Sequence, residues 1–197
     1  MAESICITEN DEVVLRKSQQ KPAVEILSAF LRSVPALIRY GRTKIYEADT
    51  FYTPYRLEQY EVSETGEVYC LVCSYVSEDI AVFSEKRTGA ACHTKEQISP
   101  AFRIRATRNE SAVHDEIKNQ MQLDHAIRKV LSGHHLNQVS TQTVFLPEQV
   151  YYANGKDTYV FAVDLFQEKV DFRNLSAIQE QIASNYLNEH PELQKTG

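Results

Sequence analysis

Hydrophobic side chains recur every three or four residues in three parts of the chain, a spacing that gathers them on one side of an α-helix. These parts cover residues 21–34, 111–133 and 176–190. Pro22 is typical of a first helical position, and Ser111 and Ser176 are typical N-cap residues. We therefore predict three amphipathic helices, the first of which should end or kink at Pro35, with Gly41 closing the segment.

Between these helices the hydrophobic period shortens to two, which is typical of β-strands. The predicted strands cover residues 44–52, 55–62, 67–76, 79–83, 138–146, 149–153, 158–166 and 169–172, and an N-terminal β-hairpin is predicted over 4–17. Pro54 should separate the first two strands. The run 67–76 is almost uncharged, which favours a central strand buried on both faces. The Asn154–Gly155 pair favours a hairpin turn with a positive backbone angle.

The order helix, strand, strand, buried strand occurs twice, which predicts two related α-β-β-β units and an internal duplication. Equivalent positions are Ala23 with Ala112, Gly41 with Gly133, Pro54 with Pro147, Gly66 with Gly155, and Phe83 with Phe172. The chain divides into an N-terminal β-hairpin (1–20), a first helix-plus-meander unit (21–84), an irregular connector (85–110), a second such unit (111–173), and a C-terminal helix and tail (174–197). This pattern predicts an α+β fold with antiparallel sheets and helices packed on one face.

The α-β-β-β order resembles that of cystatin-like and PepSY-like modules, in topology alone. The resemblance implies a binding or inhibitory domain without chemistry of its own, because those modules act in that way. Fold order by itself does not assign a function.

Composition indicates a globular protein, with 43% hydrophobic and 24% charged residues. The formal net charge of −6 argues against a general nucleic-acid binder, which needs a basic face for phosphates. The N-terminal residues do not resemble a secretory leader, and no run approaches the roughly 18 apolar residues of a membrane span. We expect a cytoplasmic protein with neither a nucleic-acid nor a membrane partner.

Cys92 and His93 are the candidate catalytic residues, because a cysteine nucleophile needs an electropositive surrounding and a nearby base. Lys86, Arg87 and Lys95 flank them. An ordinary loop cysteine beside a solvent-facing histidine explains the same residues, and His114, His125, His134 and His135 are alternative bases. Neither assignment is fixed by the sequence.

Zinc binding by Cys70, Cys73, Cys92 and His93 is a further alternative. Strand residues three apart point to opposite faces, so Cys70 and Cys73 should not share one metal ion. We therefore predict neither a metal nor a cofactor.

Candidate binding residues fall into two groups. Arg103 and Arg105 are placed to lie on one face of a strand, where guanidinium groups suit phosphate or carboxylate. Most tyrosines fall in predicted strands, where they either form a recognition face or simply follow strand preference: Tyr46, Tyr52, Tyr55, Tyr60, Tyr69, Tyr75, Tyr151, Tyr152 and Tyr159. Tyr55, Tyr60 and Tyr151 represent the predicted face.

Three functions from different classes follow from these observations. The first is a non-enzymatic binding, adaptor or inhibitor protein that holds a protein partner, or a second copy of itself, through a sheet face or the arginine segment. The second is a small cysteine-dependent hydrolase or transferase that uses Cys92. The third is a module that holds a small ligand in a cavity between helix and sheet.

Overall fold

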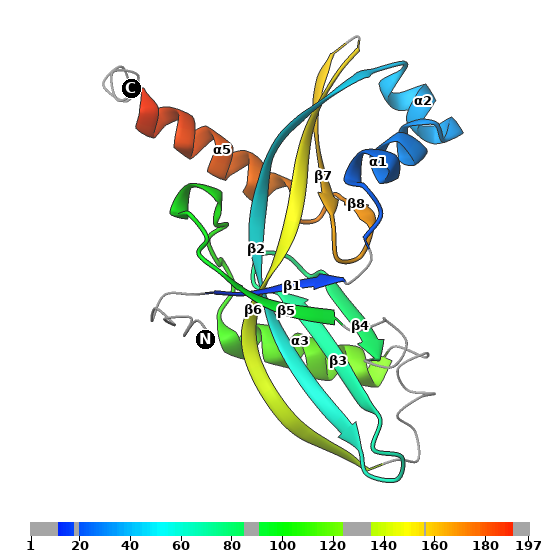
Figure 1. Ribbon diagram of the computed structural model, residues 1–197, viewed down its shortest axis with the longest axis vertical. Coiled ribbons are helices and arrows are strands. Elements are labelled where there is room, and N and C mark those ends of the chain that lie inside the picture. The colour runs from blue at the N-terminus through cyan, green and yellow to red at the C-terminus, as the bar shows by residue number, and fades with distance from the viewer. Residues whose placement is uncertain (1–11, 18–19, 85–90, 124–134, 156, 191–197) are drawn as a thin grey trace, which may run out of the picture.

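The computed structural model describes residues 12–17, 20–84, 91–123, 135–155 and 157–190 (Figure 1). In chain order its elements are β1 (Glu12–Lys17), α1 (Ala23–Leu31), α2 (Val34–Tyr40), β2 (Lys44–Val62), β3 (Val68–Ser74), β4 (Ile80–Ser84), β5 (Ala91–Glu96), η1 (Pro100–Phe102), α3 (Glu110–Leu123), β6 (Leu136–Asn154), β7 (Thr158–Asp164), β8 (Lys169–Asp171) and α5 (Leu175–Glu189). The described residues form a mostly antiparallel eight-stranded sheet with α-helices packed against it, so the fold is α+β.

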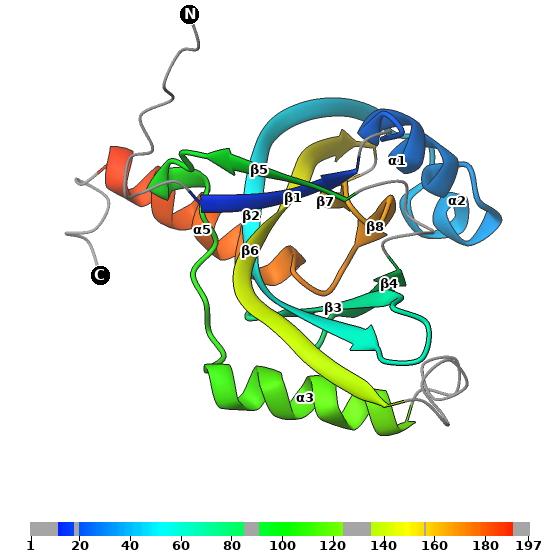
Figure 2. The same cartoon turned by 60° about the horizontal axis from the view of Figure 1, so that its bottom comes forward.

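Two long strands form the spine of the molecule. β2 and β6 each contain 19 residues and pair antiparallel from Lys44↔Asn154 to Val62↔Leu136. Figure 2 shows that both strands bend along their length. The prediction that Pro54 separates two strands is wrong, since Pro54 lies inside β2 and pairs with Phe145. A proline fits there because the ladder between β2 and β3 begins only one residue later, at Tyr55.

The two ends of this spine are built alike. β3 pairs with the C-terminal half of β2 over Tyr55–Glu61, and β7 pairs with the C-terminal half of β6 over Glu148–Asn154. Each ladder starts directly after a proline whose carbonyl accepts an N–H from the far strand: Tyr75 to Pro54 at 3.0 Å, and Leu165 to Pro147 at 3.1 Å. The halves therefore share element order and register, while their origin by duplication stays a prediction.

The strands β1 and β5 differ from what was predicted for the N-terminal hairpin and for the connector 85–110. The first strand of the predicted N-terminal hairpin lies outside the described residues. β1 pairs antiparallel with β5 and touches β6 in parallel at Val14↔Phe145. The connector 85–110, predicted to be irregular, thus contains a strand and the short helix η1. Its partner β1 is distant in sequence, so the local pattern did not reveal the pairing.

Two helices begin at residues other than the predicted ones, because side chains that the prediction did not consider cap their N-termini. The first predicted helix is divided, because Pro35 lies in the first turn of a separate helix, α2, and the Ser33 hydroxyl accepts the Ala36 N–H at 3.4 Å. Gly41 closes α2 with a positive φ of 70°, as predicted. Asn109, and not Ser111, caps α3 by accepting the Ala112 N–H at 2.8 Å.

The β6–β7 turn needs its glycine for space. The described turn residues Asn154 and Gly155 have no positive φ, contrary to the prediction. A Cβ on Gly155 would lie 3.2 Å from the Arg42 carbonyl oxygen and 3.3 Å from that of Tyr40. Gly155 therefore lets the tip of β6 pack against the link between α2 and β2.

Each helix covers its own part of the sheet (Figures 1 and 2). Hydrophobic clusters join α1 to β7 (Leu27 and Phe161), α3 to β3 (Ile117 and Leu71) and α5 to β7 (Ile178 and Ala162). In the described part of the chain, no helix combines the length and apolar character that crossing a bilayer requires.

Candidate functional site: an arginine-lined groove

The groove is formed by residues 103–109, which run from η1 to α3 across the middle of the spine. The Ile104 N–H donates to the Tyr52 carbonyl at 3.0 Å, and Arg103 forms a parallel bridge with Tyr52. Ile104 itself is buried in the cluster around Phe51. The start of the segment is thereby fixed to β2.

The other end of the segment 103–109 is held by the Tyr75 carbonyl, which lies opposite Pro54. In an antiparallel pair, residues opposite one another exchange two N–H···O bonds, but Pro54 has no N–H to give to Tyr75. The Tyr75 carbonyl instead accepts the N–H groups of Thr107 and Arg108, at 3.0 and 2.9 Å. Pro54 therefore leaves open the acceptor that holds the segment over the sheet.

The three arginines of this segment have different environments. Arg108 donates through Nη1 to the carbonyls of Ser74 at 3.1 Å and Ser77 at 2.5 Å, which makes it part of the scaffold. Arg103 pairs with Glu12, and its guanidinium carbon lies 5.0 Å from the centre of the Phe145 ring. Arg105 is exposed and forms no hydrogen bond or ion pair with any described residue.

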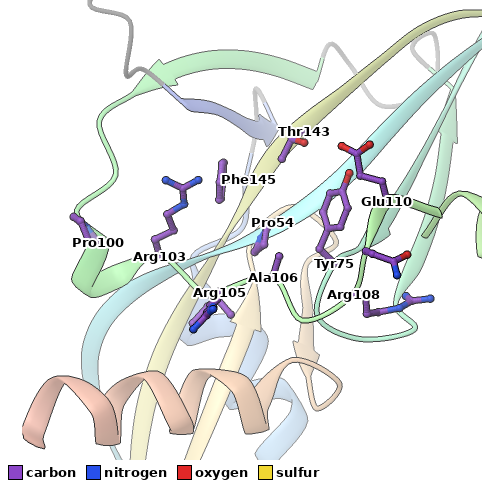
Figure 3. A pocket seen from close by; sticks show the side chains of 12 residues that line it. Pro54, Tyr75, Pro100, Arg103, Arg105, Ala106, Arg108, Glu110, Thr143 and Phe145 are labelled. Carbon is purple, nitrogen blue, oxygen red and sulfur yellow. The ribbon is translucent and has the colours of Figure 1, made fainter. Parts of the chain in front are cut away.

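The floor of the groove is apolar. Pro54, Tyr75 and Phe145 are buried beneath it, and Arg103, Arg105 and Arg108 stand along the segment that borders it (Figure 3). The groove encloses about 660 Å³, which is within the range of ligand sites. It combines an apolar floor with cationic side chains and, at the start of α3, the Glu110 carboxylate. The part that Arg103 and Arg105 border suits a ligand that has both apolar and anionic parts.

A second group of polar side chains lies inside the protein. The Asn174 amide nitrogen is 2.9 Å from the Tyr55 hydroxyl, 2.9 Å from Glu148 Oε1 and 2.8 Å from Asp171 Oδ2. Its amide oxygen accepts the Ser77 hydroxyl at 2.8 Å. These residues come from both α-β-β-β units, so the network joins the two halves.

Asp79 continues this network towards the surface. It accepts the Tyr55 hydroxyl at 3.1 Å and the Gln167 amide at 2.8 Å, and it pairs with Lys169 at 3.0 Å and Arg173 at 2.8 Å. Asp79 is fully buried, whereas both cations are partly exposed.

Burial raises the pKa of Glu148 in this network and of Asp164 beside it. Desolvation raises the pKa of Asp164 to about 6, and the Asp171 charge adds to that rise. Desolvation, with the nearby charges of Asp171 and Asp164, holds the pKa of Glu148 well above its usual range. Asp164 Oδ2 is buried without a hydrogen-bond partner among the described residues. In those residues, no group of three or more His, Cys, Asp or Glu side chains is arranged to hold a metal ion.

The tyrosines predicted to form a recognition face are inside the protein. Tyr55, Tyr60 and Tyr151 are 0, 8 and 2% exposed, respectively. Tyr60 donates its hydroxyl to buried Glu58 at 2.5 Å, and Tyr151 packs in the core cluster around Leu27. These three side chains therefore do not form the expected exposed face. Leu15 of β1 and Phe166 cover Tyr55, whereas α3 covers Tyr60 and α1 covers Tyr151.

Cys92 lies in β5 opposite Arg16, and its side chain is outside the described residues. Its role as a nucleophile therefore stays a prediction. His93 Nδ1 lies 3.4 Å from the Gln142 amide nitrogen.

Cys70 and Cys73 belong to different core clusters on opposite faces of β3, as the strand geometry predicts. Burial raises the pKa of Cys73 to about 11, which makes this thiol a poor nucleophile.

Sequence reasoning identified Arg103 and Arg105 but not the groove that they border. Pro54 was the available signal, since a proline inside a strand leaves one acceptor on the opposite strand open. The network around Asn174 had no comparable signal, because its members are scattered along the chain.

Comparison with protein families, curated proteins and solved structures gave no match for this chain.

Proposed function

We propose that the protein is a non-enzymatic binding module that holds an acidic, partly apolar segment of a partner protein in the groove over Pro54 and Phe145. The observation that carries this proposal is Arg105, an exposed guanidinium at an apolar groove with no ion pair among the described residues. Guanidinium groups bind carboxylates through two parallel hydrogen bonds, which makes an acidic side chain the matching group on the partner.

The scaffold around Arg105 supports binding rather than catalysis. The segment is fixed to β2 and to Tyr75 on either side of Arg105, so it presents the guanidinium without first having to fold. Burying an apolar side chain on the floor would add affinity that is independent of charge. The cysteine-dependent enzyme and the small-ligand module remain predictions that the groove does not favour.

The proposal is tested by selecting binders from a random peptide library on the wild-type protein. We expect the selected peptides to combine Asp or Glu with apolar residues. Arg105→Glu should weaken the binding of these peptides by about ten- to a hundred-fold, because a charge-assisted hydrogen bond contributes about 1.5–3 kcal/mol. Fluorescence polarisation of labelled peptides measures the dissociation constants.

Lys118→Glu is the matched control, since Lys118 is an exposed cation on α3 that does not line the groove. It should leave peptide affinity within about two-fold, because exposed charges at a distance are screened. Selected peptides without acidic residues, or equal affinities for the wild type and Arg105→Glu, would show that the groove does not recognise carboxylates.

A further inference from the structure

One end of the groove already holds a carboxylate of this chain. Arg103 forms an ion pair with Glu12, the first residue of β1. The Glu12 carboxylate also accepts the Ile98 N–H at 3.3 Å, which fixes its position beside η1. Because Arg103 lies over the Phe145 ring of the groove floor, β1 begins at the edge of the groove. The residues that precede β1 in the sequence are therefore tethered at this edge.

The next arginine along the segment 103–109 has no such carboxylate among the described residues. Arg103 has an extended backbone, with φ −92° and ψ 117°. Ile104 is buried, whereas Arg103 and Arg105 are exposed, so the two arginine side chains leave the same side of the segment. An extended chain advances about 3.3 Å per residue, which places their Cα atoms about 6–7 Å apart. A carboxylate a few residues before Glu12 can therefore reach Arg105.

Residues 1–11, which precede the described part of the chain, have the composition that the groove should bind. They contain three carboxylates and neither lysine nor arginine, which gives them a formal charge of −3 in a chain whose total is −6. The acidic residues are Glu3, Glu9 and Asp11, and the run Ile5-Cys6-Ile7 is apolar. Acidic side chains beside an apolar run match an exposed guanidinium beside an apolar floor.

The tether is long enough for residues 1–11 to cover the groove. Eleven extended residues span at most about 40 Å, whereas the seven residues 103–109 span at most about 25 Å. A segment held beside its site by a short linker has an effective concentration of the order of 1 mM. A contact with a dissociation constant of about 0.1 mM would therefore be formed in about nine of ten molecules.

We infer that residues 1–11 occupy the groove of their own chain, with the carboxylate of Glu9 or Asp11 on Arg105 and the apolar run 5–7 on the groove floor. This inference rests on the proposed function, because it takes the groove to recognise acidic, partly apolar segments. Partner proteins must then displace residues 1–11, so the chain lowers the affinity of its own groove for them.

Two other stretches outside the described residues fit the groove less well. Residues 124–134 carry two basic and one acidic side chain, and residues 191–197 carry one of each. Neither stretch therefore has the net negative charge that guanidinium groups favour. Glu110 borders the groove at the end opposite Arg103 (Figure 3), which favours placing Glu9 and Asp11, the acidic residues nearest the tether, towards Arg103.

Substitutions in the full chain test the inference. Ile5→Ser/Ile7→Ser and Glu9→Gln/Asp11→Asn should each bind the acidic peptides selected from the library about five- to ten-fold more tightly than the wild type, because the groove is then unoccupied. A synthetic peptide with the sequence of residues 1–11 should compete with the selected peptides for both variants. Fluorescence polarisation measures the affinities.

Glu25→Gln/Asp49→Asn is the matched control, since it makes the same change in net charge at exposed carboxylates that do not line the groove. It should leave peptide affinity within about two-fold of the wild type. Equal peptide affinities for the wild type and both segment variants, with weaker binding in Arg105→Glu, would reject this inference and leave the proposed function standing. If neither the wild type nor the segment variants bind acidic peptides, the proposed function is wrong and this inference falls with it.

A disulfide experiment locates the segment directly. Ala106 is exposed and lines the groove (Figure 3), and Cys6 lies in the apolar run. In a Cys92→Ser background, Ala106→Cys should form an intramolecular disulfide with Cys6 under mild oxidation, and peptide binding should be lost until the bond is reduced. Lys95→Cys is the matched control, because Lys95 is exposed and pairs with Val13 near the start of β1 but does not line the groove. It should react at least about ten-fold more slowly, since a disulfide requires close Cα atoms. Equal rates at the two positions, or a disulfide between two chains, would overturn the inference.

Discussion

Lowering the pH from 7 to about 5 should stabilise this protein, which is the reverse of ordinary acid denaturation. Burial raises the pKa of Asp164 from 3.8 to about 6 and also raises those of Glu148 and Asp171. The native state therefore binds protons more tightly than the unfolded chain does. The resulting stabilisation is fully present below the unfolded pKa values and is lost as the pH rises through the folded ones.

For Asp164, which is fully buried, this loss is about 3 kcal/mol between roughly pH 4 and pH 7.

Two other carboxyl groups act in the opposite direction. The pKa of Glu96 is lowered by its hydrogen bond from Arg16. The pKa of Glu58 is also lowered: burial acts to raise it, but the hydrogen bonds from Tyr60, Arg56 and His114 outweigh that effect. Their stabilisation is lost as the pH falls below 4.5, whereas that of Asp164 is lost as the pH rises towards about 6, so we expect maximum stability at about pH 4.5 to 5. Urea unfolding across this range measures the profile.

Asp164→Asn isolates the cause of this pH dependence. The asparagine oxygen can still accept the N–H groups of Phe166 and Gln167, both of which lie 2.8 Å from Asp164 Oδ1. We expect the variant to be more stable than the wild type at pH 7 and to lose much of the slope between pH 5 and 7. Asp157→Asn, at an exposed turn carboxylate, should leave the slope unchanged. A wild-type protein that becomes more stable from pH 5 to pH 7 would contradict the assignment.

Asn174→Ala should lower the free energy of unfolding by about 4 kcal/mol. The substitution removes an amide that contacts the Tyr55 hydroxyl, Glu148 Oε1 and Asp171 Oδ2, all inside the protein. Each buried polar atom left without its partner costs about 1–3 kcal/mol. Because the network joins the two α-β-β-β units, the loss should weaken the contact between them. Chemical denaturation at pH 7 measures the change.

Asn185→Ala provides the comparison on the same helix. Asn185 donates to the Ala101 carbonyl at 2.7 Å from a partly buried position, so its removal should cost about 1 kcal/mol. If the two variants lose the same free energy, Asn174 does not hold the halves together. A larger loss in Asn174→Ala at pH 7 than at pH 5 would connect the network to the protonation of its carboxyl groups.

The sequence by itself determined most of the elements of this fold, but not β5, the division between α1 and α2, or the continuity of β2 through Pro54. The period of hydrophobic residues located the helices and the uncharged run that became β3, because each element must bury one side or both. It also predicted that a helix is followed by a set of strands in each half, although the two strands predicted on either side of Pro54 are one strand, β2. It indicated Arg103 and Arg105 as anion-binding candidates. These features depend on residues close together in the chain, and local spacing carries that information.

Only the tertiary structure decided which surfaces are exposed and which distant groups meet. Tyr55, Tyr60 and Tyr151 have the same strand pattern that an exposed tyrosine would have, yet helices and neighbouring strands cover them. The pairing of β1 with β5 and the network around Asn174 join residues about 80 to 120 positions apart. The sequence does not determine such contacts locally, because they depend on how the whole spine bends and on which elements pack against it.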